Sequence, residues 1–212
     1  MRPLGLLGGT FDPIHYGHLR LAEEAREALD LAEVRWIPAG QPPHRLVPRV
    51  DAAHRLAMVR QAVAGNPAFA VDDAETLSTA PSYTVTTLER LRAAAGDRPL
   101  VLLMGADAFL GLAAWHRWRD LFALAHLGVA SRPGFALSSD ELPAELADVC
   151  ADRLGRNPDA LRAAPAGRVV EFDMTPLAIS ASLLRARLAT GQSVRYLLPD
   201  PVREYIDQHH LY

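Results

Sequence analysis

The sequence predicts an α/β fold in which helices cover both faces of a doubly wound, mostly parallel sheet. Short apolar segments with the length of buried strands alternate with longer segments of helical period. Polar or turn-forming residues follow several of these strands, as in parallel sheets whose ligands bind at the carboxyl ends of the strands. No repeat and no Gly/Ser-rich linker interrupts the 212 residues, so we expect a single domain over residues 1–212.

The first half of the chain begins with a strand, a loop and a helix. Gly8 and Gly9 form a turn directly after the first apolar segment. Asp51 is a typical N-cap, because its carboxylate can accept a hydrogen bond from a free amide of the first helical turn. The elements expected here are strands at residues 3–7, 34–37 and 69–71, and helices at residues 17–30 and 51–64 and after Tyr83.

The second half continues the alternation and ends in two helices. Gly191 is expected to end the first of them, while Asp200 and Pro201 have the residue types of an N-cap and a first helical position. The Ala-, Asp- and Pro-rich residues 138–166 are interpreted as helical padding or a peripheral excursion. The other elements expected here are strands at residues 100–104, 127–130 and 169–172, and helices at residues 115–125, 180–189 and 201–209.

Composition excludes several classes of function. The formal net charge of -3 gives no basic field for nucleic acid, so no nucleic-acid partner is expected. The sequence contains no lysine, which rules out a Schiff-base lysine or a Walker lysine. The single cysteine, Cys150, cannot form an intramolecular disulfide, and no apolar stretch has the length of a membrane span. We therefore expect a cytoplasmic protein without a membrane partner, with homo-oligomerisation left open.

The most informative segment, GGTFDPIHYGH, joins the first strand to the first helix. Gly8 and Gly9 allow backbone amides to approach an anion closely, and the helix start adds unpaired amides and a positive dipole end. His15 and His18 are three residues apart, so both imidazoles lie on one face of the first turn. Gly17 between them leaves room for a ligand. The segment thus predicts a phosphate site at the exit of the first strand.

Other interpretations of this segment remain open. The glycines followed by Asp12 and Pro13 can form an ordinary turn, and a histidine at a helix start can be a surface residue. The glycine spacing does not fit a dinucleotide fingerprint, and the P-loop pattern is absent. His15 and His18 could instead bind a metal ion with His44 as a further ligand, although no H-E-x-x-H motif is present.

The segment resembles the T/HxGH signature of the nucleotidyltransferase superfamily, with Thr10 opening the motif ahead of His15 and His18. The whole chain is similar to the bacterial nicotinate-mononucleotide adenylyltransferases. The matching segments are GGTFDPIHYGHL at 8–19, IPAGQPPHR at 37–45, APSYTVTTL at 80–88, MGADAF at 104–109, WHRW at 115–118, SRPG at 131–134, ISAS at 179–182 with Arg185, and LLPDPVREYI at 197–206.

This resemblance implies a Rossmann-like fold, ATP and nicotinate mononucleotide as substrates, and Mg²⁺ bound mainly through the ATP phosphates. The products would be nicotinate adenine dinucleotide and pyrophosphate, a step of NAD biosynthesis. The residues fit direct in-line attack. A nucleotide phosphate is largely dianionic at neutral pH and needs no general base, so the protein must supply position and positive potential.

The expected nucleotide site has two parts. Backbone amides and Thr10 in the first loop orient the phosphates, and the start of the helix at residues 180–189 adds amides and serine hydroxyls for the β- and γ-phosphates. The catalytic residues implied are His15, His18 and Arg185. The ATP-binding residues implied are Gly8, Gly9, Thr10, Phe11, His18, Ile179, Ser180, Ser182 and Arg185.

The acceptor site must recognise a pyridine ring with a carboxylate or an amide. Trp115 can stack on the electron-poor ring, whereas Trp118 is expected in the core. Ala39 and Gly40 stand where some relatives carry asparagine, so only backbone contacts are expected there, and Asp107 could be a helix N-cap instead of a ribose contact. The acceptor-binding residues implied are Thr10, His44, Arg45, Tyr83, Thr84, Asp107, Trp115 and Arg132.

Two functions from other classes compete with the transferase. A metal-dependent hydrolase would use His15, His18 and His44, and would lose activity on chelation. A nucleotide sensor would bind ATP and release no pyrophosphate with any acceptor. Within the superfamily, the SYT and tryptophan segments favour pyridine nucleotides over other acceptors.

Overall fold

The structure, a computed structural model, describes residues 1–42, 47–132, 134, 137 and 142–212. The chain divides into two compact units. The first unit contains Met1–Leu7, Leu21–Val34 and Tyr83–Thr175, and the second contains Gly8–Arg20, Arg35–Ser82 and Pro176–Tyr212. The expectation of a single domain over residues 1–212 stays a prediction.

The strands of the described residues form a sheet with the order β3-β2-β1-β4-β5-β7-β6. Strand β4 pairs in parallel with β1 and β5, and β7 pairs in parallel with β5 and β6. The predicted mostly parallel sheet is therefore confirmed. The strands are β1 (Leu4–Gly9), β2 (Glu33–Pro38), β3 (Phe69–Val71), β4 (Leu100–Gly105), β5 (His126–Ser131), β6 (Leu154–Gly155) and β7 (Val169–Asp173).

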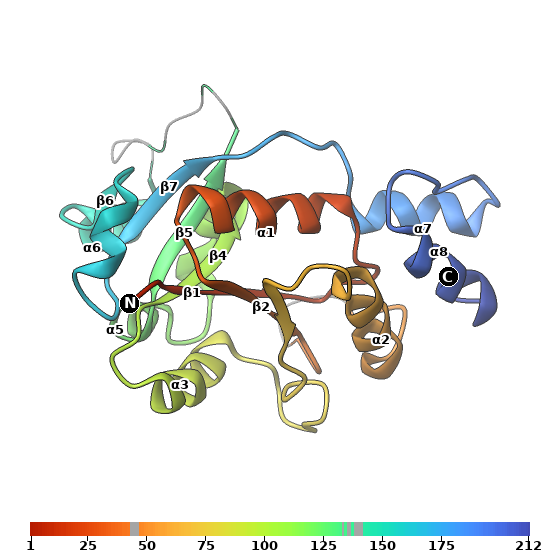
Figure 1. Cartoon of the computed structure of the whole chain (residues 1–212), viewed down its shortest axis with the longest axis horizontal. Coiled ribbons are helices and arrows are strands. Elements are labelled where there is room, and N and C mark those ends of the chain that lie inside the picture. The colour runs from red at the N-terminus through yellow and green to blue at the C-terminus, as the bar shows by residue number, and fades with distance from the viewer. Residues whose placement is uncertain (43–46, 133, 135–136, 138–141) are drawn as a thin grey trace. The chain divides into compact units, whose positions relative to one another are not determined.

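Helices lie on both faces of the strands. Figure 1 shows α1 on one face and α3 on the opposite face. The α-helices are α1 (Tyr16–Ala28), α2 (Ala52–Val63), α3 (Thr84–Ala95), α4 (Ala106–Leu110), α5 (Leu121–Leu124), α6 (Ala144–Cys150), α7 (Ala181–Ala189) and α8 (Asp200–Gln208); the 3₁₀ helices are η1 (Leu112–Ala114), η2 (Trp118–Asp120) and η4 (Pro158–Arg162).

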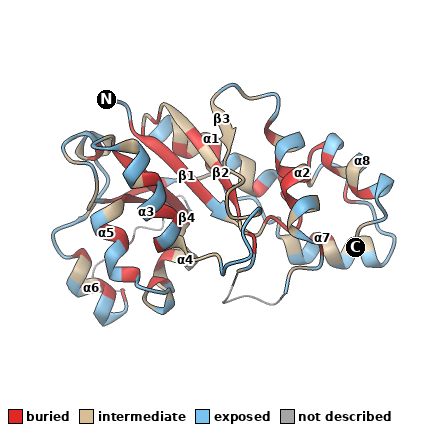
Figure 2. Ribbon diagram, turned by 90° about the horizontal axis from the view of Figure 1, so that it is seen from below, coloured by how far each residue is buried: buried red, intermediate tan, exposed pale blue. Residues whose placement is uncertain are grey.

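The core of the first unit lies between the sheet and the end of α1. Figure 2 shows β1 and β4 as largely buried. A Cβ at Gly5 would lie 2.7 Å from a methyl group of Leu31, and one at Gly128 would lie 2.8 Å from a methyl group of Leu29. Both distances are too short, so these glycines let the leucines pack directly on the strands.

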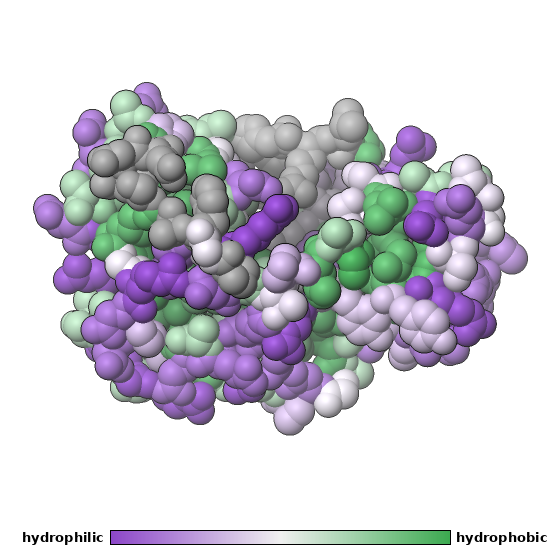
Figure 3. All heavy atoms as spheres, turned by 90° about the horizontal axis from the view of Figure 1, so that it is seen from above, coloured by the Kyte–Doolittle hydropathy of each residue, from purple (hydrophilic) through white to green (hydrophobic). Residues whose placement is uncertain are grey.

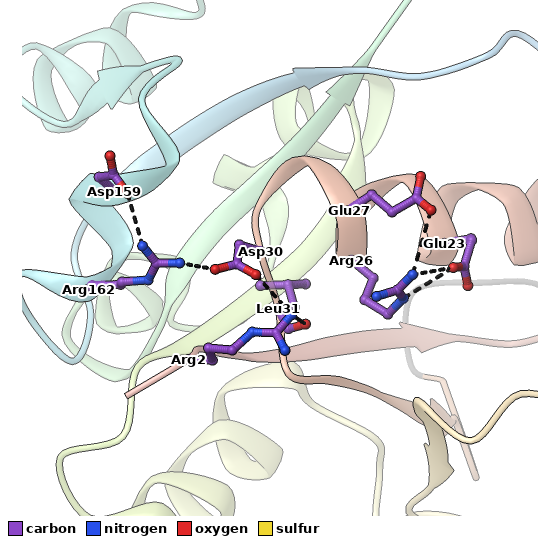
Figure 4. A network of polar contacts seen from close by, with 8 residues as sticks. All are labelled: Arg2, Glu23, Arg26, Glu27, Asp30, Leu31, Asp159 and Arg162. Atoms are coloured by element: carbon purple, nitrogen blue, oxygen red, sulfur yellow. Dashed lines mark hydrogen bonds and ion pairs between the residues drawn. The ribbon is translucent and has the colours of Figure 1, made fainter.

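A network of charged side chains ties the N-terminal segment of the first unit to the residues after α1 and to η4 (Figure 4). Asp30 accepts from Arg2 at 2.9 Å and also pairs with Arg162. Arg162 pairs in turn with Asp159 at 3.0 Å. These side chains are about half exposed, so each pair stabilises the fold only modestly.

The predicted helix ends agree with the structure in three places and differ in one. The Asp51 carboxylate accepts from the amide of His54 (2.9 Å), which confirms the N-cap. Ser180 caps α7, and Gly191 follows its end with a φ of +69°. The prediction for α8 was wrong by one position: Pro199 is the N-cap, because Asp200 and Pro201 already lie within the helix.

Two further predictions need correction. The helix expected at residues 115–125 is two short elements, η2 and α5, because Arg117 adopts a left-handed conformation that no continuous helix accommodates. Residues 138–166 contain more than helical padding. They include α6, η4 and the short strand β6, which extends the sheet beside β7.

The face of the molecule drawn in Figure 3 is largely hydrophilic, with hydrophobic side chains in separate patches. Within the described residues, no helix has the length and apolar character needed to cross a membrane.

Candidate functional site

The end of β1, the loop after it and the start of α1 contain the predicted residues of the N-terminal motif, and they lie in the second unit. The prediction of a turn at Gly8 and Gly9 was wrong, because both glycines are the last residues of β1. Gly8 is exposed, and a Cβ at this position would meet no atom within 4 Å. The backbone of Gly8 is therefore accessible to a ligand. A Cβ at Gly9 would lie 2.9 Å from the Phe11 ring, so Gly9 is needed for packing as well as for any phosphate contact.

The imidazole rings of His15 and His18 stack with their centroids 3.7 Å apart and their planes at 23°. His15 immediately precedes α1 and His18 lies in its first turn, so the structure brings the two predicted histidines together. A Cβ at Gly17 would lie 3.0 Å from the His15 ring. The glycine between the histidines thus makes room for an imidazole as well as for a ligand.

The hydrogen bonds of the two rings differ. Nδ1 of His18 accepts from the amide of His15 (3.3 Å), so the proton of a neutral His18 ring is on Nε2, which can donate to a phosphate oxygen. Nδ1 of His15 has no hydrogen-bond partner among the described residues. Burial lowers the pKa of His15 from 6.5 to about 4, so this imidazole is neutral at physiological pH.

The side chain of Phe11 lies in the core and not along a ligand. It is 2% exposed and contacts the edge of the His18 ring at a centroid distance of 5.1 Å. On its other side it contacts Trp36 at 5.5 Å. Only the backbone of Phe11, with its left-handed φ of +50°, remains for the predicted nucleotide contact. The Phe11 ring instead packs against the His18 ring and supports it.

The start of α7 lies beside the start of α1. A Cβ at Gly17 would lie 3.6 Å from the carbonyl oxygen of Ile179, the residue before the N-cap. The hydroxyl of Ser180 accepts from the amide of Leu183 (3.2 Å) and keeps its own proton to donate. Helix geometry leaves the amides of the first two residues, Ala181 and Ser182, outside the intrahelical ladder. This helix start can therefore bind an anion.

Arg185 extends from α7 to the first loop. Its Nη1 donates to the carbonyl oxygen of Asp12 (2.6 Å) and lies 3.8 Å from the Asp12 carboxylate, while Nη2 donates to the hydroxyl of Ser182 (3.2 Å). Asp12 is 5% exposed and also accepts from the amide of Arg49 (2.8 Å) and the hydroxyl of Tyr212 (2.7 Å). These contacts fix the guanidinium beside the histidine loop.

A buried arginine that the sequence analysis did not identify connects the first loop to the turn after β2. Arg55 on α2 is 1% exposed. Its Nη1 donates to the carbonyl oxygens of Thr10 (2.7 Å) and Ala39 (2.6 Å), and Nη2 donates to that of Gly40 (3.0 Å). Burial lowers the pKa of this guanidinium, and the carboxylate of Asp12 opposes that shift.

The turn at Ala39 and Gly40 is held from its other side by Ser82. The hydroxyl of Ser82 accepts from the amides of Gly40 (2.9 Å) and Gln41 (3.1 Å). A Cβ at Gly40 would collide with the carbonyl oxygen of Glu75, which excludes an asparagine here. The amide of Gly40 and the carbonyls of Ala39 and Gly40 have partners within the protein, and each carbonyl keeps a second lone pair, so backbone contacts to the acceptor at this turn stay a prediction.

A second group of predicted residues comes together in the first unit. Tyr83 caps α3 in an extended conformation and Thr84 is the first residue of that helix. The Tyr83 ring packs on His116 at a centroid distance of 4.3 Å. This contact brings Trp115, the neighbour of His116 in the chain, to the start of α3. Tyr83, Thr84 and Trp115 are all half-buried, so their side chains are accessible.

The remaining predicted residues are less constrained. Asp107 is exposed and is not the N-cap of α4, since that position is Gly105. Arg132 follows β5 and is exposed. Trp118 is 5% exposed and packs on Phe122, which confirms the expected core position. His44 and Arg45 lie outside the described residues.

A metal ion held by the protein itself would need several ligand side chains close together. No group of three His, Cys, Asp or Glu side chains that could hold an ion occurs within residues 1–42, 47–132, 134, 137 and 142–212. Asp12, the buried carboxylate of the first loop, is already paired with an amide, a hydroxyl and Arg185. A metal bound through the phosphates of a ligand fits this loop better than a protein cage does.

Arg55, Ser82 and His116 were not identified as site residues in the sequence analysis. Of these three, only Arg55 could have been recognised from the sequence pattern. Arg55 falls on the buried face of α2 with Leu56, Met58, Val59 and Val63, and a charged residue on such a face indicates a specific partner. Ser82 and His116 each lie beside a predicted site residue, but their partners are distant in sequence. Nothing in the sequence pairs Ser82 with Gly40.

The chain is similar to known proteins over almost its whole length. Residues 6–187 match the family described as cytidylyltransferase-like. A probable nicotinate-nucleotide adenylyltransferase of Dechloromonas aromatica is 60% identical, and the match covers 99% of this chain and 97% of that protein. A probable nicotinate-nucleotide adenylyltransferase of Halorhodospira halophila is 52% identical over 97% of this chain and 93% of its own length.

Solved structures show the same fold at low identity. The nicotinic acid mononucleotide adenylyltransferase of Plasmodium falciparum complexed with NaAD has a TM-score of 0.74 at 15% identity, covering 100% of this chain and 98% of that one. The same enzyme complexed with APC has a TM-score of 0.73 at 14% identity, with the same coverage of both chains.

Proposed function

The chain belongs to the cytidylyltransferase-like family, among the nicotinate-nucleotide adenylyltransferases, and from this membership we propose that it transfers the adenylyl group of ATP to nicotinate mononucleotide. The products are nicotinate adenine dinucleotide and pyrophosphate, which places the reaction in NAD biosynthesis. The protein is thus a nucleotidyltransferase with a Rossmann-like fold.

One observation supports the phosphate chemistry most directly. Three positive or donating features meet within the second unit: the stacked imidazoles of His15 and His18, the start of α7, and the guanidinium of Arg185. The exposed Gly8 lies near the end of β1, just before the loop that leads to α1. Such a set stabilises negative charge, and in-line attack by a dianionic phosphate requires no general base beyond it.

Each residue of this set has a distinct proposed role. His18 donates from Nε2 to the triphosphate near the α-phosphorus, where charge accumulates on the oxygen that leaves with pyrophosphate. His15, held neutral by burial, orients His18 through the stacked rings and contacts the phosphates. The start of α7, with Ile179, Ser180 and Ser182, binds the β- and γ-phosphates. Arg185 clamps the same phosphates, and Gly8, Gly9, Thr10 and the backbone of Phe11 orient them.

The acceptor residues are proposed separately. Tyr83 and Thr84 at the start of α3 offer amides and a hydroxyl to the ring carboxylate, and Trp115 stacks on the pyridinium through its π-face. Asp107 accepts from a ribose hydroxyl. The contacts proposed for the acceptor phosphate are Thr10, His44, Arg45 and Arg132.

Mg²⁺ is proposed as the required ion, bound mainly through the ATP phosphates, and its charge partly neutralises the triphosphate. The protein groups remain responsible for position: the loop amides hold the triphosphate, and the histidines face the reacting phosphorus.

A product assay tests the proposal. The protein is mixed with ATP, Mg²⁺ and either nicotinate mononucleotide or nicotinamide mononucleotide, and pyrophosphate and dinucleotide are measured. We expect both products in equal amounts, with nicotinate mononucleotide as the better acceptor. Binding of ATP without pyrophosphate from either acceptor would support the sensor instead. Hydrolysis that depends on zinc and not on magnesium would support the hydrolase.

A further inference from the structure

The first unit contains a cavity that the transferase chemistry does not use. Its volume is about 470 Å³. Its walls come from η2 and α5, from the residues after α6 and from the segment before β7. The lining residues are Arg119, Phe122, Ala123, Arg153, Pro165, Ala166 and Gly167.

The cavity lies at the end of the strands opposite the predicted acceptor residues of this unit. The carbonyl of Pro165 accepts from the amide of Leu100 at the beginning of β4 (3.3 Å), and the amide of Gly167 donates to the carbonyl of Ala125, just before β5 (3.2 Å). Asp107 and Arg132 instead follow the carboxyl ends of β4 and β5. The two places are therefore distinct.

The cavity has two cations in its walls and no acidic side chain. The guanidinium of Arg153 donates to the carbonyl of Gly167 (3.0 Å) and lies 5.6 Å from the centre of the Phe122 ring. The guanidinium of Arg119 lies 4.4 Å from the centre of the Trp118 ring. Neither arginine has a carboxylate within ion-pair distance in the part of the chain that the structure describes. Both arginines are exposed, so solvent screens their mutual repulsion, and an anion in the cavity could accept hydrogen bonds from both guanidiniums.

Further guanidiniums lie around the cavity. Arg92 donates to the carbonyl of Pro165 (2.8 Å), and Arg168 follows Gly167 in the chain. The positive potential affects two neighbouring groups. Burial lowers the pKa of His126, and Arg92 and Arg168 lower it further. Burial raises the pKa of Cys150 to about 11, and Arg153 opposes that shift. The acidic residues nearest in sequence, Asp97, Asp120 and Asp152, do not line the cavity.

The rest of the wall determines what kind of anion fits. Phe122, Ala123, Pro165 and Ala166 present an apolar surface beside the two guanidiniums. Gly167 has a φ of +100°, and a Cβ there would lie 3.2 Å from Nη1 of Arg153, so the glycine keeps space for this side chain. Guanidiniums bind phosphate oxygens with paired N–H donors, and an aromatic wall favours a planar group.

We propose that this cavity is a binding site for a phosphorylated small molecule. Its phosphate or pyrophosphate lies between Arg119 and Arg153, and a planar or apolar portion packs on Phe122 and Pro165. The site consists of residues of the first unit alone and does not depend on the proposed transferase function. Its ligand is a regulator or a carried molecule, not a reactant.

Indole NMR signals give a readout specific to this cavity. The protein has three tryptophans, so a ¹⁵N-indole spectrum contains three signals, which substitution by phenylalanine assigns. Trp118 is the tryptophan whose ring lies against Arg119. Inorganic pyrophosphate and AMP are titrated separately, up to roughly ten millimolar. We expect a saturable shift of the Trp118 signal, with AMP binding more tightly if the apolar wall contributes.

Arg153→Gln is the decisive variant, because it leaves the contact between Arg119 and Trp118 in place. It should weaken the titration of the Trp118 signal about tenfold or more. Arg195→Gln, a change at an exposed arginine of the other unit, should leave the titration unchanged. A Trp118 signal that does not move with either ligand contradicts the proposal, and so does one that moves equally in the Arg153→Gln protein. The signals of Trp36 and Trp115 report any binding elsewhere.

Discussion

The rings of His15 and His18 stack at 3.7 Å, and Nδ1 of His18 is occupied by the amide of His15. One histidine therefore sets both the tilt and the tautomer of the other. His15 is nearly buried and neutral, whereas His18 is more exposed and presents Nε2–H. The stacked pair therefore holds the Nε2–H group of His18 in a fixed orientation at the start of α1.

Replacing His18 by Ala should lower kcat by roughly 10²-fold or more, because the lost donor stabilises charge in the transition state. Initial rates of pyrophosphate release at varied ATP provide the measurement. His210→Ala, at an exposed histidine outside the loop, is the matched control and should retain full activity. An increase in KM for ATP with unchanged kcat would contradict the role given to His18.

Gly8→Ala tests whether a phosphate approaches the exposed backbone of the first loop. A Cβ at Gly8 meets no protein atom within 4 Å, so the free energy of unfolding should stay within about 0.5 kcal/mol of that of the original protein. The added methyl group should nevertheless raise the KM for ATP, since it would stand where the phosphate approaches. Gly40→Ala is the opposite case. Its Cβ would collide with the carbonyl of Glu75, so this variant should lose stability.

Arg55→Met should weaken both the fold and catalysis. The change leaves the carbonyls of Thr10, Ala39 and Gly40 without their donor, and the free energy of unfolding should fall by about 3 kcal/mol. Displacement of the first loop should lower kcat by at least about tenfold. Urea unfolding and initial rates measure the two effects.

Two comparison variants make the Arg55 prediction specific. Arg55→Lys retains a charge but cannot reach all three carbonyls, so it should be intermediate in both measurements. Arg60→Met removes an exposed arginine of the same helix and should change stability by less than about 0.5 kcal/mol. Full activity in a folded Arg55→Met protein would show that this arginine does not position the loop.

Trp115→Ala should raise the KM for nicotinate mononucleotide and leave the KM for ATP nearly unchanged, since the indole is proposed to stack on the acceptor ring. Trp118→Ala is the contrasting variant. Trp118 is 5% exposed, so its truncation should lower stability by about 3 kcal/mol or more. If Trp115→Ala impaired both substrates equally and destabilised the fold, the indole would be a core residue instead.

Burial of His15 makes stability depend on pH. Its pKa in the folded protein is about 4 against 6.5 unfolded, so the unfolded state binds more protons between these values. The stabilisation is complete above pH 6.5 and decreases as the pH falls toward 4, by about 3 kcal/mol. Urea unfolding of the original protein and of His15→Asn over this range should show a steeper loss for the original. Parallel curves would show that His15 is not buried as a neutral imidazole.

The local pattern of the sequence predicted the sheet and the first loop because both depend on neighbouring residues. The strand over residues 100–104 is apolar throughout, and Asp51 and Ser180 precede their helices as caps do. The region near Trp115 was less predictable. A left-handed Arg117 breaks the helical pattern there, and no residue type indicates that conformation in advance.

The site was predictable where one segment contains its chemistry and unpredictable where distant segments meet. His15, Gly17 and His18 stand within four residues of each other. Arg55 acts through four carbonyls, those of Thr10, Ala39, Gly40 and Val50, and Ser82 acts through amides about forty residues away. Backbone groups have no sequence signature, so hydrogen bonds to them appear only in the folded chain.

A crystal structure with a non-hydrolysable ATP analogue and Mg²⁺ tests the central claim most directly, because it places the triphosphate on the protein. We predict phosphate oxygens within hydrogen-bond distance of the Gly9 backbone, Nε2 of His18 and the start of α7 at Ser180. A triphosphate bound away from all three of these residues would contradict the account.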